Sequence, residues 1–173
     1  SIDTQVKKNH IDNMLNKNVN LGKKTVGDGH APYLIAEAGL NHNGDIKIAK
    51  KLVDAASYAK ADLIKFQTFR TELGITINAK KAKYQKIMTG SKESQFDMVK
   101  KLELSDDDFL ELQSYCTTKN INFFSTAFDL PSIDFLHKIG QDKFKIPSGE
   151  ITNLPYLRYI GQLNKPIIMS TGM

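Results

Sequence analysis

The sequence predicts an α/β fold, with a parallel sheet and helices packed outside it. From Tyr33 onward, short apolar runs alternate with segments of helical periodicity. The apolar runs carry apolar residues on both faces, which is typical of strands that are buried on both sides. Right-handed crossovers between such strands make the sheet parallel. These observations leave open whether the sheet is doubly wound or forms the first half of a barrel.

Five strands and four connecting helices are expected. The first helix follows Asp45, a suitable N-cap, and its apolar residues recur at helical spacing over residues 46–56. The second begins at Ser105, and its acidic first turn suits the positive end of the helix dipole. Pro131 lies near the start of the third helix, and residues 154–163 form the fourth. The expected strands are residues 33–39, 62–69, 122–128, 143–148 and 166–172.

Two segments fall outside this alternation. Residues 1–30 are rich in Lys, Asn and Gly and have no sustained period, so a polar extension or linker is expected there. Within it, a short helix is expected at 11–15 and a loop at 22–29. Residues 31–173 then form the main domain. Residues 70–104 are an insertion between the second and third strands.

Composition excludes several classes of protein. No apolar run approaches the roughly 20 residues that a membrane-spanning helix needs. The net charge is +5, but only Arg70 and Arg158 are arginines among 24 basic residues, and scattered lysines are a poor match to a nucleic-acid reader. The single cysteine, Cys116, favours a reducing compartment. We therefore expect a cytoplasmic protein that binds neither nucleic acid nor membrane.

Polar residues interrupt the apolar strands near their carboxyl ends, where parallel α/β proteins assemble their sites. Together they would form a cationic cup for a ligand with phosphate and carboxylate groups, with two glutamates as acid and base. Structural interpretations remain open: a Glu37–Lys145 ion pair, a snorkelling Lys65, and hydroxyls that cap turns. The polar residues near the carboxyl ends of the five expected strands are Glu37, Lys65, Gln67, Ser125, Thr126, Lys145, Ser148, Glu150, Ser170 and Thr171.

The turn at residues 41–44 is a second concentration of polar groups. Its His42 either stabilises the turn or serves the site as a ligand or proton donor. The other histidines are His10, His30 and His137, and no pair has metal-binding spacing. The sequence therefore predicts no metal site within the chain.

Six blocks of sequence occur in a specific order between residues 33 and 173. They are IAEAGLNHNG at 35–44, IKFQTF at 64–69, ESQ at 93–95 with KLELS at 101–105, FSTAFD at 124–129, FKIPSGEITNLPY at 144–156 and STGM at 170–173. In these blocks the chain resembles the sialic acid synthase family, which includes N-acetylneuraminate synthase and its legionaminate and pseudaminate relatives. The resemblance implies a (β/α)8 TIM barrel, of which this chain holds the N-terminal portion with about five strands.

The resemblance also implies a reaction. Family members condense phosphoenolpyruvate with an N-acetylated amino sugar, such as N-acetylmannosamine, and give a nonulosonic acid and phosphate with the help of Mn²⁺ or Mg²⁺. By motif, the implied catalytic residues are Glu37, Lys65, Lys145 and Glu150. The implied substrate-binding residues are Gln67, Thr126, Ser148 and Ser170, and we add Asn41 and His42 from the turn. The two histidines that bind the family's metal lie beyond Met173.

The predicted chain stops after the fifth strand, so we expect a fragment, or one piece of an assembly, that is inactive alone. The open edges of a partial barrel predict self-association, as a homodimer or a larger species. Two alternatives stay open. One is a Schiff-base aldolase-type barrel that uses Lys65 or Lys145, and the other is a non-catalytic half-barrel that binds a ligand or self-associates. The particular nonulosonic acid is not predicted.

Overall fold

A computed structural model describes residues 18–22, 24–74 and 94–172. The helix expected at 11–15 lies outside these residues, as do Glu93 and Met173 of the sequence blocks. The chain divides into two units, Ser1–Tyr33 and Leu34–Met173, and each is described by itself. Among the described helices, none is long and apolar enough to cross a membrane.

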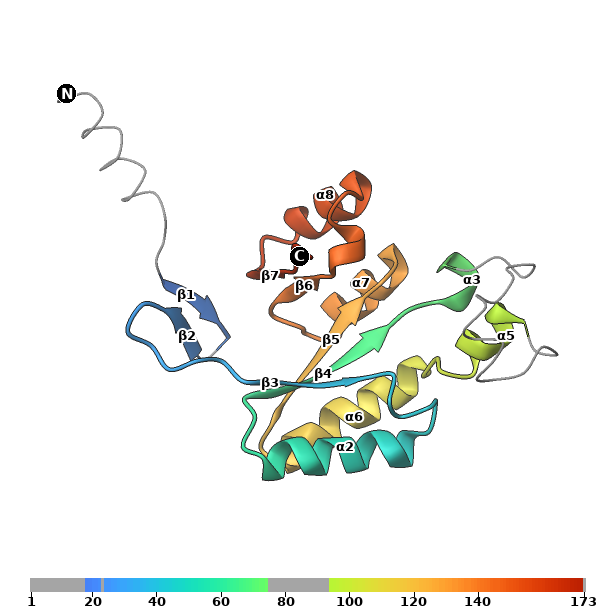
Figure 1. The fold of residues 1–173 in the computed structure, drawn as a ribbon, viewed down its shortest axis with the longest axis horizontal. Helices are drawn as coiled ribbons and strands as arrows, with labels where there is room; N and C mark the ends of the chain where they lie inside the picture. Colours follow the sequence, from blue (N-terminus) through green and yellow to red (C-terminus); the bar gives the residue numbers. More distant parts are fainter. Residues whose placement is uncertain (1–17, 23, 75–93, 173) are drawn as a thin grey trace. The chain divides into compact units, whose positions relative to one another are not determined.

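The first unit contains an antiparallel hairpin of β1 (Asn18–Leu21) and β2 (Lys24–Gly27) (Figure 1). The prediction of a loop throughout 22–29 is therefore wrong, because half of that segment is strand β2. Val19 lies opposite Val26, and Gly22 adopts a φ of +71° in the connecting turn, which glycine reaches without steric cost. Asparagine, lysine and glycine have low strand propensity. Because they make up much of this segment, the short hairpin could not be recognised from the sequence.

The second unit is an α/β fold built on parallel strands (Figure 1). A three-stranded sheet contains β3 (Ile35–Gly39), β4 (Leu63–Thr68) and β5 (Asn122–Ala127) in that order. A separate parallel pair contains β6 (Phe144–Ile146) and β7 (Ile167–Met169). Each strand lies inside a segment predicted as a strand but is shorter than that segment. In β6 and β7 the polar residues at the carboxyl ends, such as Ser148 and Ser170, already lie beyond the strand.

A side chain replaces the strand ladder between β5 and β6. Gln141, which precedes β6, is buried, and its Oε1 accepts a hydrogen bond from the Ser125 amide at 2.8 Å. Its Nε2 donates to the Ser125 carbonyl at 3.1 Å, so the amide group pairs with β5 as a peptide group would. The prediction of one continuous parallel sheet is therefore not met in the described part of the chain.

The helices begin where the sequence places their caps. The Asp45 carboxylate accepts from the Lys47 amide at 2.7 Å, and Ser105 forms a capping box with Asp108. Both predicted caps are thereby confirmed. The described helices are α2 (Ile46–Tyr58), α3 (Thr71–Gly74), α5 (Gln95–Lys100), α6 (Asp106–Thr118), α7 (Leu130–Lys138) and α8 (Leu154–Gln162), with a 3-10 turn η1 (Ser148–Glu150).

Two apolar clusters fix which face of each strand the helices cover. α2 and α6 lie side by side against β3, β4 and β5 (Figure 1), and Phe66 of β4 is buried in the cluster that they form. The second cluster joins α7 and α8 to β6 through Ile133, Phe144 and Ile146. Because side chains alternate along a strand, Lys65, Gln67 and Lys145 face the opposite side from these apolar residues.

Candidate functional site

The register of the strands gathers polar side chains on the face that the helices do not cover. Glu37 of β3 lies opposite Lys65 of β4, and Gln67 lies opposite Thr126 of β5. Partners in a parallel register point to the same face. Four of the residues predicted for the site are therefore neighbours on adjacent strands.

The strongest contact in this group is an ion pair between Lys65 Nζ and Glu37 Oε2. The Lys65 side chain is 8% exposed, whereas the Glu37 side chain is 52% exposed. The sequence suggested Lys145 as the structural partner of Glu37, and the structure pairs Glu37 with Lys65 instead. The reason is the register, which sets Glu37 and Lys65 directly opposite each other.

Lys145 completes the charged group. It is half-buried, and its ammonium group makes no hydrogen bond or ion pair within the described residues. Burial lowers the pKa of Lys145, the Lys65 charge lowers it further, and the Glu37 carboxylate partly opposes both. Two ammonium groups beside one carboxylate leave an excess of positive charge, which suits an anionic ligand. We call Glu37, Lys65, Gln67, Thr126 and Lys145 the lysine cluster.

Thr126 adds an unused hydroxyl to the lysine cluster. Its side chain is buried, and its Oγ1 has no hydrogen-bond partner within the described residues. A buried hydroxyl group without a hydrogen-bond partner lowers the stability of the fold. The Thr126 hydroxyl is therefore a good candidate to form a hydrogen bond with a ligand. Lys145 and Thr126 thus offer two open polar groups to a ligand.

The loop residues predicted at the carboxyl ends are more dispersed. Ser148 is exposed, and Ser170 is half-buried, with its amide donating to the Ile146 carbonyl at 3.0 Å. Glu150 accepts a hydrogen bond from Asn153 Nδ2 at 2.6 Å. No described hydrogen bond or ion pair joins these three to Lys145. They lie in the loops that follow β6 and β7, so the structure places them along the rim of the site.

Asn41 and His42 are not brought to the lysine cluster. Asn41 is exposed and donates from Nδ2 to the Ala38 carbonyl at 3.0 Å. His42 is fully buried, its Nδ1 accepts from the Gly44 amide at 3.0 Å, and its ring centroid lies 6.2 Å from that of Phe66. Phe66 faces the helices, so His42 lies on the face opposite the cluster. Both side chains therefore form hydrogen bonds with backbone groups in and beside the turn.

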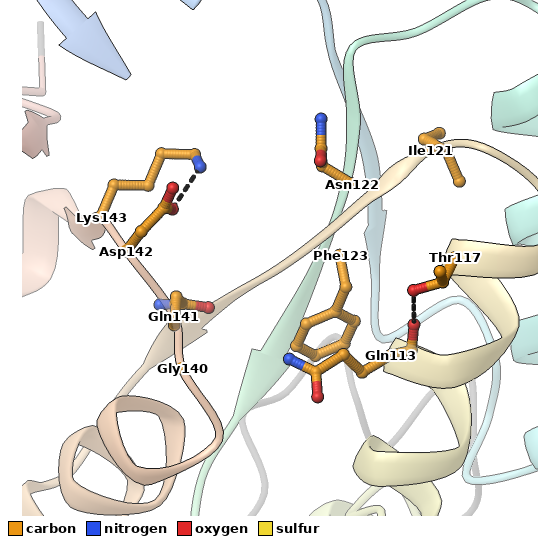
Figure 2. Close-up of a pocket in the computed structure, with 9 residues that line it drawn as sticks. All are labelled: Gln113, Thr117, Ile121, Asn122, Phe123, Gly140, Gln141, Asp142 and Lys143. Atoms are coloured by element: carbon orange, nitrogen blue, oxygen red, sulfur yellow. Dashed lines mark hydrogen bonds and ion pairs between the residues drawn. The ribbon is translucent and has the colours of Figure 1, made fainter. Parts of the chain in front are cut away.

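Sequence reasoning did not single out Lys143, which the structure buries. Its Nζ pairs with Asp142 Oδ1 at 2.6 Å and lies 5.8 Å from the centroid of the Phe124 ring. This pair lines a hollow of about 220 Å³ at the amino-terminal ends of β5 and β6. Figure 2 shows the residues that line it. Lys143 and Lys145 are two residues apart, and side chains at this spacing on a strand point to the same face of the sheet. This spacing is the sequence signal that could have identified Lys143.

The described residues do not offer a complete site for a metal ion. Among them, no group of three or more His, Cys, Asp or Glu side chains is close enough to hold one. The lysine cluster also has only one carboxylate, and Lys65 already neutralises it.

Parallel strands, helices on one face and a cationic cluster on the other define an α/β protein whose polar residues gather on the uncovered face of its strands. The family model described as the NeuB family matches residues 52–173, and the chain belongs to this family. This finding confirms the resemblance to sialic acid synthases.

Named relatives agree with the family. The chain is 54% identical over 140 residues to the N,N'-diacetyllegionaminic acid synthase of Campylobacter jejuni, covering 81% of this chain and 42% of that protein. It is 46% identical over 158 residues to the enzyme of that name from Legionella pneumophila, covering 91% and 44%. The chain thus spans less than half the length of these curated relatives.

A solved structure gives the same result. The N-acetylneuraminic acid synthetase of Leptospira borgpetersenii, crystallised with citrate, superposes with a TM-score of 0.76 at 33% identity. The match covers 90% of this chain and 50% of that one. The fold of the second unit is therefore shared with a synthetase of this family.

Proposed function

We propose that this chain carries the phosphoenolpyruvate-binding part of a nonulosonic acid synthase, within the N-terminal portion of a (β/α)8 barrel. The observation that carries the proposal is the lysine cluster, where the Lys145 ammonium and the Thr126 hydroxyl have no partner in the described part of the chain, beside the Glu37–Lys65 pair. Phosphoenolpyruvate has a phosphate and a carboxylate, and both are suited to ammonium and hydroxyl groups. Ser148 and Ser170 would add hydroxyls from the rim.

The proposed reaction forms one carbon–carbon bond. C3 of phosphoenolpyruvate attacks the aldehyde carbon of an open-chain amino sugar, which leaves an oxocarbenium ion at C2. Water adds to C2, and phosphate leaves by cleavage of the C2–O bond. The added water loses both of its protons as the C2 keto group forms. One balances the proton that the former aldehyde oxygen gains, and the other leaves with the phosphate as hydrogen phosphate.

The residues of the cluster fit separate parts of this reaction. Lys65 and Lys145 would stabilise the negative charge of the departing phosphate. Glu37, whose carboxylate is half-exposed, would transfer protons or hold substrate hydroxyls, and Gln67 would face the sugar. Glu150 would serve as a second acid or base from the rim, where it now bonds Asn153.

We propose an N,N'-diacetylated nonulosonic acid as the product. The Campylobacter and Legionella relatives support this choice, since both are named for that product. The sugar substrate would then carry two N-acetyl groups.

We also propose that the whole protein uses Mn²⁺ or Mg²⁺, held by residues outside the described part of the chain. Adding EDTA to the whole protein should abolish phosphate release, and adding Mn²⁺ should restore it.

Titration calorimetry with phosphoenolpyruvate tests the proposal on this chain. Lys145→Ala removes the cation without a partner, so the affinity should fall about tenfold or more, as for the loss of a charge-assisted hydrogen bond. Lys51→Ala is the matched control, because it removes the same charge from an exposed position on α2. If the unmodified chain shows no heat of binding, or if both variants lose equal affinity, the proposal fails.

The lowered pKa of Lys145 favours one second candidate, a Schiff-base aldolase-type barrel. An amine with a lowered pKa is more often uncharged and can attack a carbonyl group. Borohydride reduction in the presence of a keto acid would then attach the acid to Lys145, which mass spectrometry would detect. The synthase proposal predicts no such adduct.

A further inference from the structure

Gly39 occupies an irregular position at the end of β3. Glu37 lies opposite Lys65, but Gly39 lies opposite Phe66, so β3 has one extra residue here and forms a bulge. The φ of Gly39 is +51°, in the left-handed region that favours glycine. Bulges of this kind change the direction of neighbouring side chains.

The space beside Gly39 is taken by two members of the lysine cluster. A Cβ atom added at Gly39 would lie 3.3 Å from Glu37 Oε1 and 3.6 Å from Gln67 Nε2. Gly39 is itself buried, so a side chain added at this position meets these two groups first. The missing side chain leaves room for the carboxylate and the amide to lie on either side of one backbone position.

We propose that Gly39 is a positioning residue: its bulge and its missing side chain hold the Glu37 carboxylate on Lys65 and keep the Gln67 amide beside it. The inference rests on the proposed function only in treating the lysine cluster as a ligand site. A larger residue at this position displaces the carboxylate, because the Glu37 side chain is half-exposed and has room to move outward.

Lys145 reports the position of Glu37 without any ligand. The charged groups that face Lys145 are Lys65, which lowers its pKa together with burial, and Glu37, which raises it. When the carboxylate moves away, burial and the Lys65 charge act unopposed. The pKa of Lys145 then falls below its value in the unmodified chain.

Three variants separate backbone strain from occupied space. Gly39→Ala adds a Cβ atom and strains the backbone. Gly39→Asn adds more atoms but tolerates the left-handed region, where Asn43 and Asn120 of this chain already lie at a φ of +53°. Gly140→Ala is the control, because Gly140 has a φ of +89° and nothing within 4 Å of an added Cβ.

The measurement is the titration of the Lys145 side chain by NMR of 13C-labelled lysine, with the signal assigned through Lys145→Gln. We expect a lower midpoint in Gly39→Asn and Gly39→Ala and an unchanged midpoint in Gly140→Ala. In a Glu37→Gln background, where the charge is already absent, adding Gly39→Asn should produce no further shift. General structural damage would shift the midpoint in that background as well.

Either of two results overturns the inference: a folded Gly39→Asn variant with the unmodified Lys145 midpoint, or an equal shift with and without Glu37. Amide spectra establish that each variant is folded, and Gly39→Asn decides the question if Gly39→Ala does not fold. Phosphoenolpyruvate titration of the unmodified chain stays a separate test. Absent binding together with the predicted shifts would remove the proposed function and leave the role of Gly39 intact.

Discussion

At the scale of single residues, His42 couples the turn after β3 to pH. Burial lowers its pKa from the ordinary value of 6.5, although Asp108 partly opposes this. Protonation would also end the hydrogen bond that Nδ1 accepts from the Gly44 amide. The folded chain therefore favours a neutral imidazole more strongly than the unfolded chain does.

The sign of the resulting pH dependence follows from proton linkage. As the pH falls below 6.5, the unfolded chain binds a proton on His42 that the folded chain does not, so the free energy of unfolding decreases. Urea unfolding between pH 8 and 5.5 should show this decrease. His42→Asn, which keeps an acceptor for the Gly44 amide, should flatten the profile, and His137→Asn, exposed on α7, should not. Equal slopes in all three proteins would contradict the prediction.

Charge pairing within the lysine cluster shows what sequence patterns can predict of a site. The positions of Lys65 and Lys145 near strand ends indicated a cationic group, because parallel strands bring such positions together. The choice of Lys65 as the partner of Glu37 depends on the register and on the bulge at Gly39. Neither is encoded in a local pattern. The two interpretations of His42 could not be separated for the same reason, since a turn can direct a side chain to either face of the sheet.

At the scale of elements, the turn before α2 depends on a close backbone contact. Gly44 has a φ of +74°, and an added Cβ would lie 2.0 Å from the Lys101 carbonyl oxygen. Gly44→Ala should lose about 1–2 kcal/mol of stability from the left-handed backbone and about 1–3 kcal/mol more from overpacking. Gly140→Ala should lose only the first amount. Equal unfolding midpoints for the two variants in urea would show that the segment at Lys101 moves away freely.

Gln141 supports a second prediction about an element, the junction of β5 and β6. Gln141→Leu would leave the buried Ser125 amide and carbonyl without partners, at a cost of about 1–3 kcal/mol for each group. Gln162→Leu, at an exposed position on α8, should change stability by less than about 0.5 kcal/mol. Chemical denaturation of both variants measures the difference. A Gln141→Leu protein as stable as the control would mean that water replaces the side chain.

The same junction explains which parts of the fold were predictable. Caps such as Asp45 and Ser105, and the segments that hold the strands, follow from local patterns that a single stretch of sequence contains. The break in the sheet depends on the side chain of Gln141, which pairs with β5 as a backbone group would. Nothing in a glutamine residue or its sequence neighbours indicates that it will have this role. The hairpin of β1 and β2 was missed because four-residue strands rich in asparagine and lysine barely alternate.

At the scale of the whole molecule, β7 presents an unpaired edge within the described residues. It pairs with β6 on one side, and no described strand lies on the other. Ile167 and Met169 are 39% and 49% exposed, so the edge is also apolar. Exposed apolar edges promote pairing between chains, and lysines on such edges prevent it. We therefore propose that this chain self-associates through β7.

Sedimentation velocity tests this proposal directly. The unmodified chain should sediment faster as its concentration rises, and the double variant Ile167→Lys with Met169→Lys should sediment as a monomer at every concentration. Tyr58→Lys is the control, because Tyr58 is 91% exposed on α2, away from β7, and its replacement changes surface apolarity without changing the edge. If the double variant associates as strongly as the unmodified chain, or if Tyr58→Lys alone disrupts association, the contact lies elsewhere on the surface.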